Sequence, residues 1–265
     1  MKTAFHLFNI VVLVYLFLCI LLYIIQEKLI FFPQKLPANY TYQFTQHFEE
    51  LYFKTADNTT LNGLLFTTDS SRGLIFYLHG NAGSLASWGQ VAKTYTDLHY
   101  DVFMLDYRGY GKSAGNIRSE QEFFEDVQLV YNSLLTKYNE KAIVVLGYSL
   151  GTGAATKLAA TNQPRLLILQ APYFSLTDMM QHRFPFLPAF LLKYKFATNT
   201  FLKDCKMPVA IFHGNKDRVI YYGSSLKLKK LLKISDTLIT LENGGHNGMT
   251  DNPQYIPALQ IVLTR

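Results

Sequence analysis

The chain has 265 residues, of which 49% are hydrophobic and 17% charged, and it carries a formal net charge of +6. This length and composition suit one large globular domain with a well-buried core and exclude an intrinsically disordered chain. The positive charge is mild and spread along the sequence, and no nucleic-acid-binding motif accompanies it, so we expect no nucleic-acid partner.

The first predicted element is an N-terminal apolar helix. Residues 7–25 are almost wholly apolar and are interrupted only by Asn9. A helix needs about 20 such residues to cross the roughly 30 Å hydrocarbon core of a bilayer. Lys2 ahead of this run would also suit a cleaved signal peptide, but residues 23–28 offer no small-x-small cleavage site. The run therefore predicts an uncleaved membrane anchor over residues 1–26, with a removed signal peptide as the alternative.

Weak charge differences bear on the orientation of this anchor. Lys2 lies on one side of it, and Lys28 and Lys35 lie on the other. This distribution hardly distinguishes the two sides, but a very short N-terminal tail more often stays in the cytoplasm. We therefore predict a single-pass membrane protein whose main domain lies on the non-cytoplasmic side. Residues 27–46 begin with an aromatic stretch and are expected to form an interfacial linker.

The remaining residues, 47–265, are predicted to form one α/β domain. The runs 47–54 and 60–66 flank a turn-like Ala-Asp-Asn segment and indicate an antiparallel hairpin. Strands then alternate with helices, which specifies a mostly parallel sheet with helices on both faces. The strands are expected over 74–78, 102–106, 142–146, 166–170, 209–212 and 237–241, and the helices over 84–98, 120–138, 152–160, 224–233 and 253–263.

One segment of this domain has no clear strand. Residues from about 172 to 207 carry many aromatic and aliphatic side chains between two predicted strands. We predict a short apolar lid insertion that shapes an acyl-binding pocket, with Phe184, Phe186 and Leu187 as substrate contacts. The alternative is that this segment packs on the core and has no role in substrate binding.

A glycine-flanked serine follows the strand at 142–146. Residues 147–151 read G-Y-S-L-G and open into the predicted helix at 152–160. A serine on a sharp strand-to-helix turn needs a backbone that a Cβ on either side would obstruct, and this pattern is typical of a nucleophile elbow. Ser149 is therefore the candidate nucleophile, and its neighbour Tyr148 is a candidate substrate contact. The alternative is an ordinary tight turn between a strand and a helix.

A candidate base and a candidate acid follow later strands. His246 lies just after the last predicted strand, where a loop could carry its imidazole to the serine. Asp217 follows the strand before it, which gives the chain order Ser, Asp, His. Asp106 is the main rival carboxylate, and we expect it to pair with Arg108 instead. Two further histidines, His79 and His213, follow strands in His-Gly pairs and are expected to be structural.

The loop after the strand at 74–78 has the sequence H-G-N-A-G at residues 79–83. Small residues let such a turn expose backbone N–H groups, so we assign the amides of Asn81 and Leu150 to an oxyanion hole. No His/Cys cluster has metal-ligand spacing and no G-x-G-x-x-G follows a strand. We therefore expect neither a metal nor a cofactor.

These motifs together resemble the α/β-hydrolase superfamily over residues 47–265. The matching sequences are HGNAG, DYRGYGKS, GYSLG, HGNKDRV and GGHN, in that order. The first two, the short insertion and KLIFFP after an N-terminal anchor look like membrane-anchored serine hydrolases grouped with serine aminopeptidase-like domains. The resemblance implies a triad of Ser149, Asp217 and His246 and an acyl-serine intermediate.

The expected function is hydrolysis of carboxylic esters, including lipid-like acyl esters, by an enzyme held at a membrane. Relatives within this superfamily cleave esters, lipid esters, thioesters and peptides, so the motifs specify the fold better than the substrate. A thioesterase or an aminopeptidase-type serine hydrolase is the alternative with the same chemistry. A non-catalytic binding protein on the same fold is the alternative from a different class.

Overall fold

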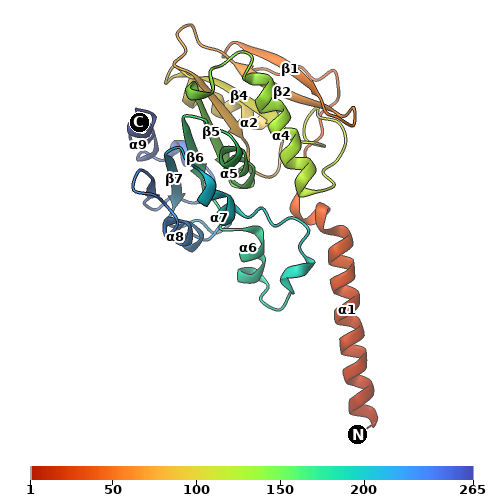
Figure 1. The fold of residues 1–265 in the computed structure, drawn as a ribbon. Coiled ribbons are helices and arrows are strands. Elements are labelled where there is room, and N and C mark those ends of the chain that lie inside the picture. The colour runs from red at the N-terminus through yellow and green to blue at the C-terminus, as the bar shows by residue number, and fades with distance from the viewer. Residues whose placement is uncertain (1, 265) are drawn as a thin grey trace.

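The computed structural model describes residues 2–264, in which a long N-terminal helix projects from an α/β domain (Figure 1). The sheet at the centre of the domain has eight strands in the order β1-β2-β4-β3-β5-β6-β7-β8. β1 pairs with β2 and β2 pairs with β4 in antiparallel fashion, and the other strand pairs are parallel. The strands are β1 (Phe48–Lys54), β2 (Thr60–Phe66), β3 (Leu74–Leu78), β4 (Asp101–Asp106), β5 (Ile143–Tyr148), β6 (Leu166–Gln170), β7 (Val209–Gly214) and β8 (Thr237–Leu241).

Helices cover both faces of this sheet. On one face of the sheet, strand side chains pack in a buried apolar cluster with α4, α5 and α8. On the other face, the alternating strand side chains pack in a second cluster with α2, α3 and α9. The predicted fold class is therefore confirmed. The helices are α1 (Lys2–Ile30), α2 (Leu85–Trp88), α3 (Ala92–Thr96), α4 (Glu120–Leu134), α5 (Gly151–Thr161), α6 (Leu176–Arg183), α7 (Thr198–Phe201), α8 (Gly223–Lys229) and α9 (Tyr255–Leu263).

The expected helix at 84–98 is broken in two. A 3-10 turn, Gly89–Val91, separates α2 from α3. Gly89 begins this turn, and a Cβ at this position would lie 2.3 Å from the ring of Phe44. Residue 89 must therefore be glycine where Phe44 of the segment 27–46 packs against it. The helix expected at 120–138 begins as expected, where the Ser119 side chain accepts a hydrogen bond from the Glu122 amide, but it ends at Leu134.

The N-terminal helix extends further than the predicted span. α1 is long and apolar enough to cross a membrane, and a signal sequence near an N-terminus has the same character. It continues through residues expected to be a linker and ends at Ile30. Phe31 and Tyr42 are buried, and backbone bridges join Pro33 to Gly83 and Lys35 to Gly111. Residues 27–46 thus pack on the α/β domain, rather than separating it from the rest of α1.

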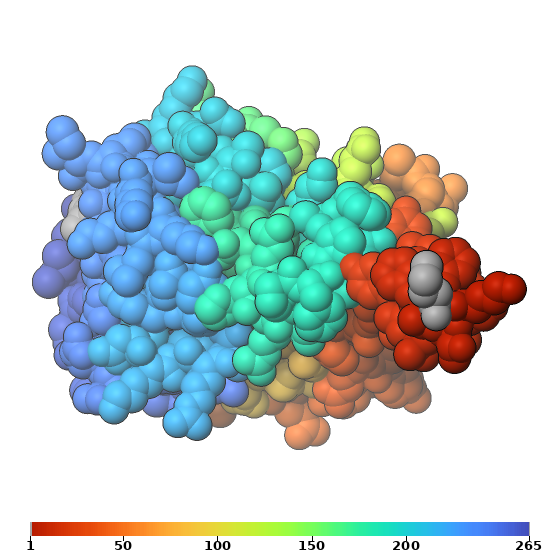
Figure 2. Space-filling model, turned by 90° about the horizontal axis from the view of Figure 1, so that it is seen from below, coloured from red at the N-terminus to blue at the C-terminus, as the bar shows by residue number. Residues whose placement is uncertain are grey.

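The predicted lid lies between the end of β6 and the start of β7 and contains no strand within the described chain. It consists of α6, α7 and short 3-10 turns at Ala189–Leu191 and Leu202–Asp204. Part of this segment lies directly against α1, as the space-filling view from below shows (Figure 2). Phe184, Phe186 and Phe190 remain exposed in it.

Candidate active site

Ser149 lies in a sharp turn between β5 and α5. Its φ is +51°, in the left-handed region that a non-glycine residue rarely adopts. A Cβ at Gly147 would lie 2.6 Å from the carbonyl oxygen of Gly151, and a Cβ at Gly151 would lie 2.1 Å from the carbonyl oxygen of Leu78. Glycine is therefore required on both sides of the serine, because the helix starts immediately against the ends of two strands.

The structure brings Ser149, His246 and Asp217 into one chain of contacts. The Nε2 atom of His246 lies 3.0 Å from the Oγ atom of Ser149, and its Nδ1 atom lies 2.7 Å from the Oδ2 atom of Asp217. Burial works against the ionisation of Asp217, but hydrogen bonds from His213 and His246 hold its pKa well below the ordinary value. An ionised Asp217 leaves the proton on Nδ1 of His246, so Nε2 is free to accept the serine proton.

His213 holds this carboxylate in place. Its Nε2 atom lies 3.2 Å from Oδ2 of Asp217 and 3.0 Å from the carbonyl oxygen of Ile220, while Nδ1 lies 2.6 Å from the hydroxyl of Ser225. Because two acceptors face Nε2, that nitrogen carries the proton and Nδ1 accepts from Ser225. The other carboxylate oxygen, Oδ1, accepts the amides of Val219 and Ile220 at 2.8 and 2.9 Å. His213, which we expect to be structural, thus lies next to Asp217 and supports it.

Tyr148 lies beside the serine but contacts a different partner from the one expected. Its hydroxyl donates a hydrogen bond to the carbonyl oxygen of His246, and its ring is buried. Tyr148 is not among the residues that line the cavity next to Ser149. The structure therefore places the Tyr148 hydroxyl under the loop that carries His246, where it holds that loop.

The rival carboxylate, Asp106, does not pair with Arg108. Its Oδ1 atom lies 3.6 Å from Nε2 of His79 and accepts the amide of Leu85 at 3.0 Å. Burial raises the pKa of Asp106. The expectation of an Asp106–Arg108 pair was wrong because the Arg108 side chain binds Asp57 of the turn between β1 and β2 and Glu122 and Asp126 of α4.

The two residues whose amides we assign to an oxyanion hole, Asn81 and Leu150, line the same cavity as Ser149. Outside helices and strands, neither the Asn81 nor the Leu150 N–H donates a backbone hydrogen bond within residues 2–264. The carbonyl of Leu150 accepts a hydrogen bond of 3.0 Å from the hydroxyl of Tyr173, a buried residue that the sequence did not single out. Both amides are thus available to a ligand, and the turn that carries Leu150 is held from behind.

The Asn81 side chain binds the end of α1. Its Nδ2 donates to the carbonyl of Ile30, the last residue of that helix. Its Oδ1 accepts the amide of Phe32 at 3.1 Å and the hydroxyl of Tyr110 at 2.8 Å. The sequence suggested no task for this side chain. In the structure it caps one of the free carbonyls that every helix leaves at its C-terminus.

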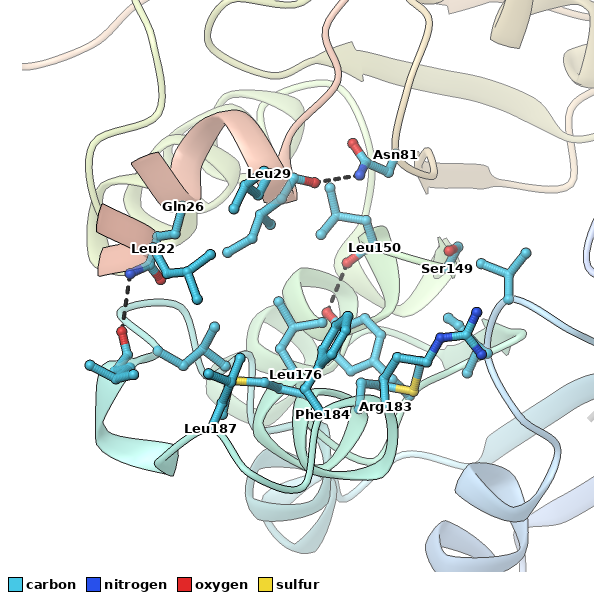
Figure 3. A pocket seen from close by; sticks show the side chains of 18 of the residues that line it. Leu22, Gln26, Leu29, Asn81, Ser149, Leu150, Leu176, Arg183, Phe184 and Leu187 are labelled. Carbon is cyan, nitrogen blue, oxygen red and sulfur yellow. Dashed lines mark hydrogen bonds between the residues drawn. The ribbon is translucent and has the colours of Figure 1, made fainter. Parts of the chain in front are cut away.

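A cavity of about 410 Å³ opens in front of Ser149 (Figure 3). Of the predicted lid contacts, Phe184 and Leu187 line it, whereas Phe186 points to solvent and is 67% exposed. Most of the wall is apolar, and Arg183 is its charged member. The lining also includes five residues of α1 that the sequence did not indicate: Leu22, Tyr23, Gln26, Leu29 and Ile30.

The described part of the chain contains no group of three or more His, Cys, Asp or Glu residues that could hold a metal ion. Cys19 and Cys205 are both free.

Known proteins resemble this chain in sequence and in structure. Residues 69–202 match the model of the Hydrolase_4 family, described as "Serine aminopeptidase, S33". The chain is 32% identical to protein bem46 of Schizosaccharomyces pombe, over 75% of this chain and 72% of that protein. It is 29% identical to alpha/beta hydrolase domain-containing protein 17B of Xenopus tropicalis, over 72% of this chain and 66% of that protein. The Pyrococcus furiosus esterase Pf2001 has the same fold, with a TM-score of 0.70 at 19% identity over 88% of this chain and 96% of that one.

Proposed function

Because the chain belongs to the serine aminopeptidase (S33) family of α/β-hydrolases, we propose that it is a serine hydrolase that cleaves carboxylic esters of lipid-like acyl groups. One observation carries this proposal. The contacts run from Asp217 through His246 to Oγ of Ser149, and Ser149 lines an apolar cavity together with Asn81 and Leu150. Such a chain of contacts is the arrangement that activates a serine for attack on a carbonyl.

In the first half of the proposed reaction, Oγ of Ser149 attacks the ester carbonyl and its proton moves to Nε2 of His246. Asp217 stabilises the imidazolium that forms. The amides of Asn81 and Leu150 donate hydrogen bonds to the oxygen that becomes negative. The proton on Nε2 then passes to the alkoxide, which leaves as the alcohol, and the acyl group stays on Ser149.

In the second half, water replaces the alcohol. His246 takes a proton from the water as it attacks the acyl-serine carbonyl, and the same two amides receive the second oxyanion. The ester bond to Oγ breaks, and the proton returns from His246 to Ser149. The product acid then leaves through the cavity.

The wall of the cavity favours an acyl group over a peptide amino terminus. Arg183 is the charged residue of the lining, and no carboxylate is present among the described lining residues to bind an α-ammonium group. This supports an esterase or a thioesterase more than an aminopeptidase. An apolar wall accepts the acyl part of an ester and of a thioester alike, so the thioesterase stays as the second candidate.

We also propose that α1 anchors the enzyme in a membrane as a single-pass helix, with the catalytic domain on the non-cytoplasmic side. The helix is apolar on all sides over most of its length, and its side chains there are exposed. A surface helix of a soluble domain would instead show one polar face. The lid segment, which carries the exposed phenylalanines, lies on the side of the domain where α1 emerges (Figures 1 and 2).

The reaction class is tested by a panel of acyl p-nitrophenyl esters, acyl thioesters and aminoacyl p-nitroanilides. Hydrolysis is followed by the colour of the released p-nitrophenol or p-nitroaniline, or by the released thiol. We expect the full-length enzyme to turn over esters with the highest kcat/KM. A fluorophosphonate probe should label Ser149 in the same preparation. A higher kcat/KM for thioesters would show that the enzyme is a thioesterase. If Ser149 is not labelled and no substrate is turned over, the chain is a non-catalytic binding protein.

The side chain of Asn81 should matter for turnover, although the oxyanion donor we propose is its backbone amide. Asn81→Ala removes the contacts with Ile30, Phe32 and Tyr110 that fix the loop. We expect kcat to fall by roughly 10-fold to 100-fold with little change in KM. A displaced donor loses more of its stabilisation of the transition state than of its contribution to substrate binding. Steady-state kinetics measure this split.

Asn132→Ala, on an exposed face of α4, is the matched control. It should leave kcat and KM unchanged. A rise in KM with unchanged kcat for Asn81→Ala would show that the side chain shapes the cavity and does not position the amide.

A further inference from the structure

The last turns of α1 form one wall of the cavity in front of Ser149. Leu22 and Leu29 face the cavity from this helix, opposite residues of the lid such as Leu187 (Figure 3), and Ile30 is also part of the lining. The membrane helix and the substrate site are therefore not separate parts of the molecule. A chain without these turns would have a groove open on one side.

Polar contacts hold α1 in this position. The amide group of Gln26 donates to the carbonyl of Leu191 at 3.1 Å and accepts the amide of Lys193 at 2.8 Å. Gln26 is 6% exposed, so its two hydrogen bonds to the lid backbone are shielded from water and expensive to leave unmade. An ion pair of 3.1 Å between Glu27 and Lys193 adds to them. The helix and the lid are thus fastened to each other through Leu191 and Lys193.

The cavity is elongated. Ser149 lies at one end of it, beside Asn81 and Leu150, and Leu22 and Leu187 lie at the other end (Figure 3). An acyl group whose carbonyl is at Ser149 must therefore extend its chain along Leu29 toward Leu22. The volume of about 410 Å³ lies within the range of pockets that enclose most of a small ligand.

We propose that Leu22 of the N-terminal helix determines the length of the acyl chain that the enzyme accepts, and that the substrates are medium-chain to long-chain acyl compounds whose tails contact α1. This inference rests on the proposed function and names the substrate class of the same site. The membrane helix has a second role in it, since one of its faces selects the substrate. Leu22 also lies within the apolar span, so the tail of the chain ends beside the part of α1 that faces lipid.

The test compares Leu22→Trp with Ile24→Trp in the full-length protein in one detergent. Ile24 is 64% exposed on the opposite side of α1 and does not line the cavity. The probes are an ethyl and a dodecyl fluorophosphonate, in which Oγ of Ser149 displaces fluoride from phosphorus. Their labelling rates are measured whatever bond the enzyme cleaves naturally. Melting temperatures show that each variant is folded.

We expect Leu22→Trp to lower the ratio of dodecyl to ethyl labelling rates by roughly 15-fold. This corresponds to two methylenes displaced from the cavity at about fourfold each. The ethyl rate should fall far less than the dodecyl rate in Leu22→Trp, and both rates should stay unchanged for Ile24→Trp. Leu187→Trp, which fills the same end from the lid, should reproduce the loss and guards against a misfolded first variant.

Three results would overturn the proposal. They are an equal loss for both probes in Leu22→Trp, the same change in Ile24→Trp, and an unchanged ratio in both Leu22→Trp and Leu187→Trp. A failure of the proposed ester hydrolysis alone can be told apart from these results. In that case the probes would still label Ser149 with chain-length dependence, but no ester would be turned over. If neither probe labels Ser149, both the proposed function and this inference are wrong.

Discussion

Replacing Ser149 with alanine is expected to lower kcat for acyl esters by roughly 10⁶-fold, the scale on which removal of the nucleophile disables a whole triad. The reason is that Oγ is the atom to which the acyl group is transferred, and no other hydroxyl lies next to Nε2 of His246 in the described structure. The measurement is the steady-state rate of p-nitrophenyl ester hydrolysis, together with loss of labelling by a fluorophosphonate. The fold should not change, because alanine meets the same left-handed φ as serine.

Ser133→Ala is the matched control for this variant. Ser133 lies on an exposed face of α4, and its hydroxyl bonds within its own helix to the carbonyl of Leu129. Its activity should equal that of the wild-type chain. Substantial turnover by Ser149→Ala would instead show that hydrolysis does not pass through an acyl-serine, and would remove the central step of the proposed mechanism.

Asp217→Asn is expected to lower kcat by roughly 10⁴-fold, because the amide stabilises the wrong tautomer of the histidine. The structure dictates how the new side chain would lie. Oδ1 accepts the amides of Val219 and Ile220, so the oxygen of an asparagine would stay there and its NH₂ would face His246. Nδ1 of His246 would then have to accept a hydrogen bond, and Nε2 would carry a proton and could not take the one from Ser149.

Two controls separate this effect from a general loss of charge. Asp97→Asn removes an exposed carboxylate that pairs with Lys93, and it should leave kcat unchanged. Asp106→Asn changes the rival carboxylate, whose partners are His79 and the amide of Leu85, and it should lower kcat far less than Asp217→Asn. If Asp106→Asn had the larger effect on kcat, the assignment of the acidic residue would have to be exchanged.

Much of the site could be predicted because its residues occupy local motifs at the ends of parallel strands. A serine between two glycines after a β-branched run specifies its own turn, whatever lies further along the chain. Asp217 and His246 follow β7 and β8, and the carboxyl ends of parallel strands meet at one edge of a sheet. The order of elements therefore suggested that the three side chains come together, without knowledge of any contact between them.

What the sequence did not indicate are the partners of side chains whose contacts are distant in sequence. Arg108 is next to Asp106 in sequence, yet its partners come from the β1–β2 turn and from α4. Tyr148 is next to Ser149, yet its hydroxyl meets the loop of His246. Proximity in sequence says little about where such long side chains point, because the strand and the turn that carry them set their directions.

The sequence by itself determined the α/β fold, the apolar N-terminal helix and the residues at the strand ends, because these depend on local turns and on the periodicity of apolar residues. Only the tertiary structure decided that this helix lines the cavity of Ser149. A helix that is apolar all round shows no preferred face, so its periodicity gives no docking side. That side is chosen by Gln26, Glu27 and the carbonyl of Ile30, which bind Leu191, Lys193 and Asn81 across the fold.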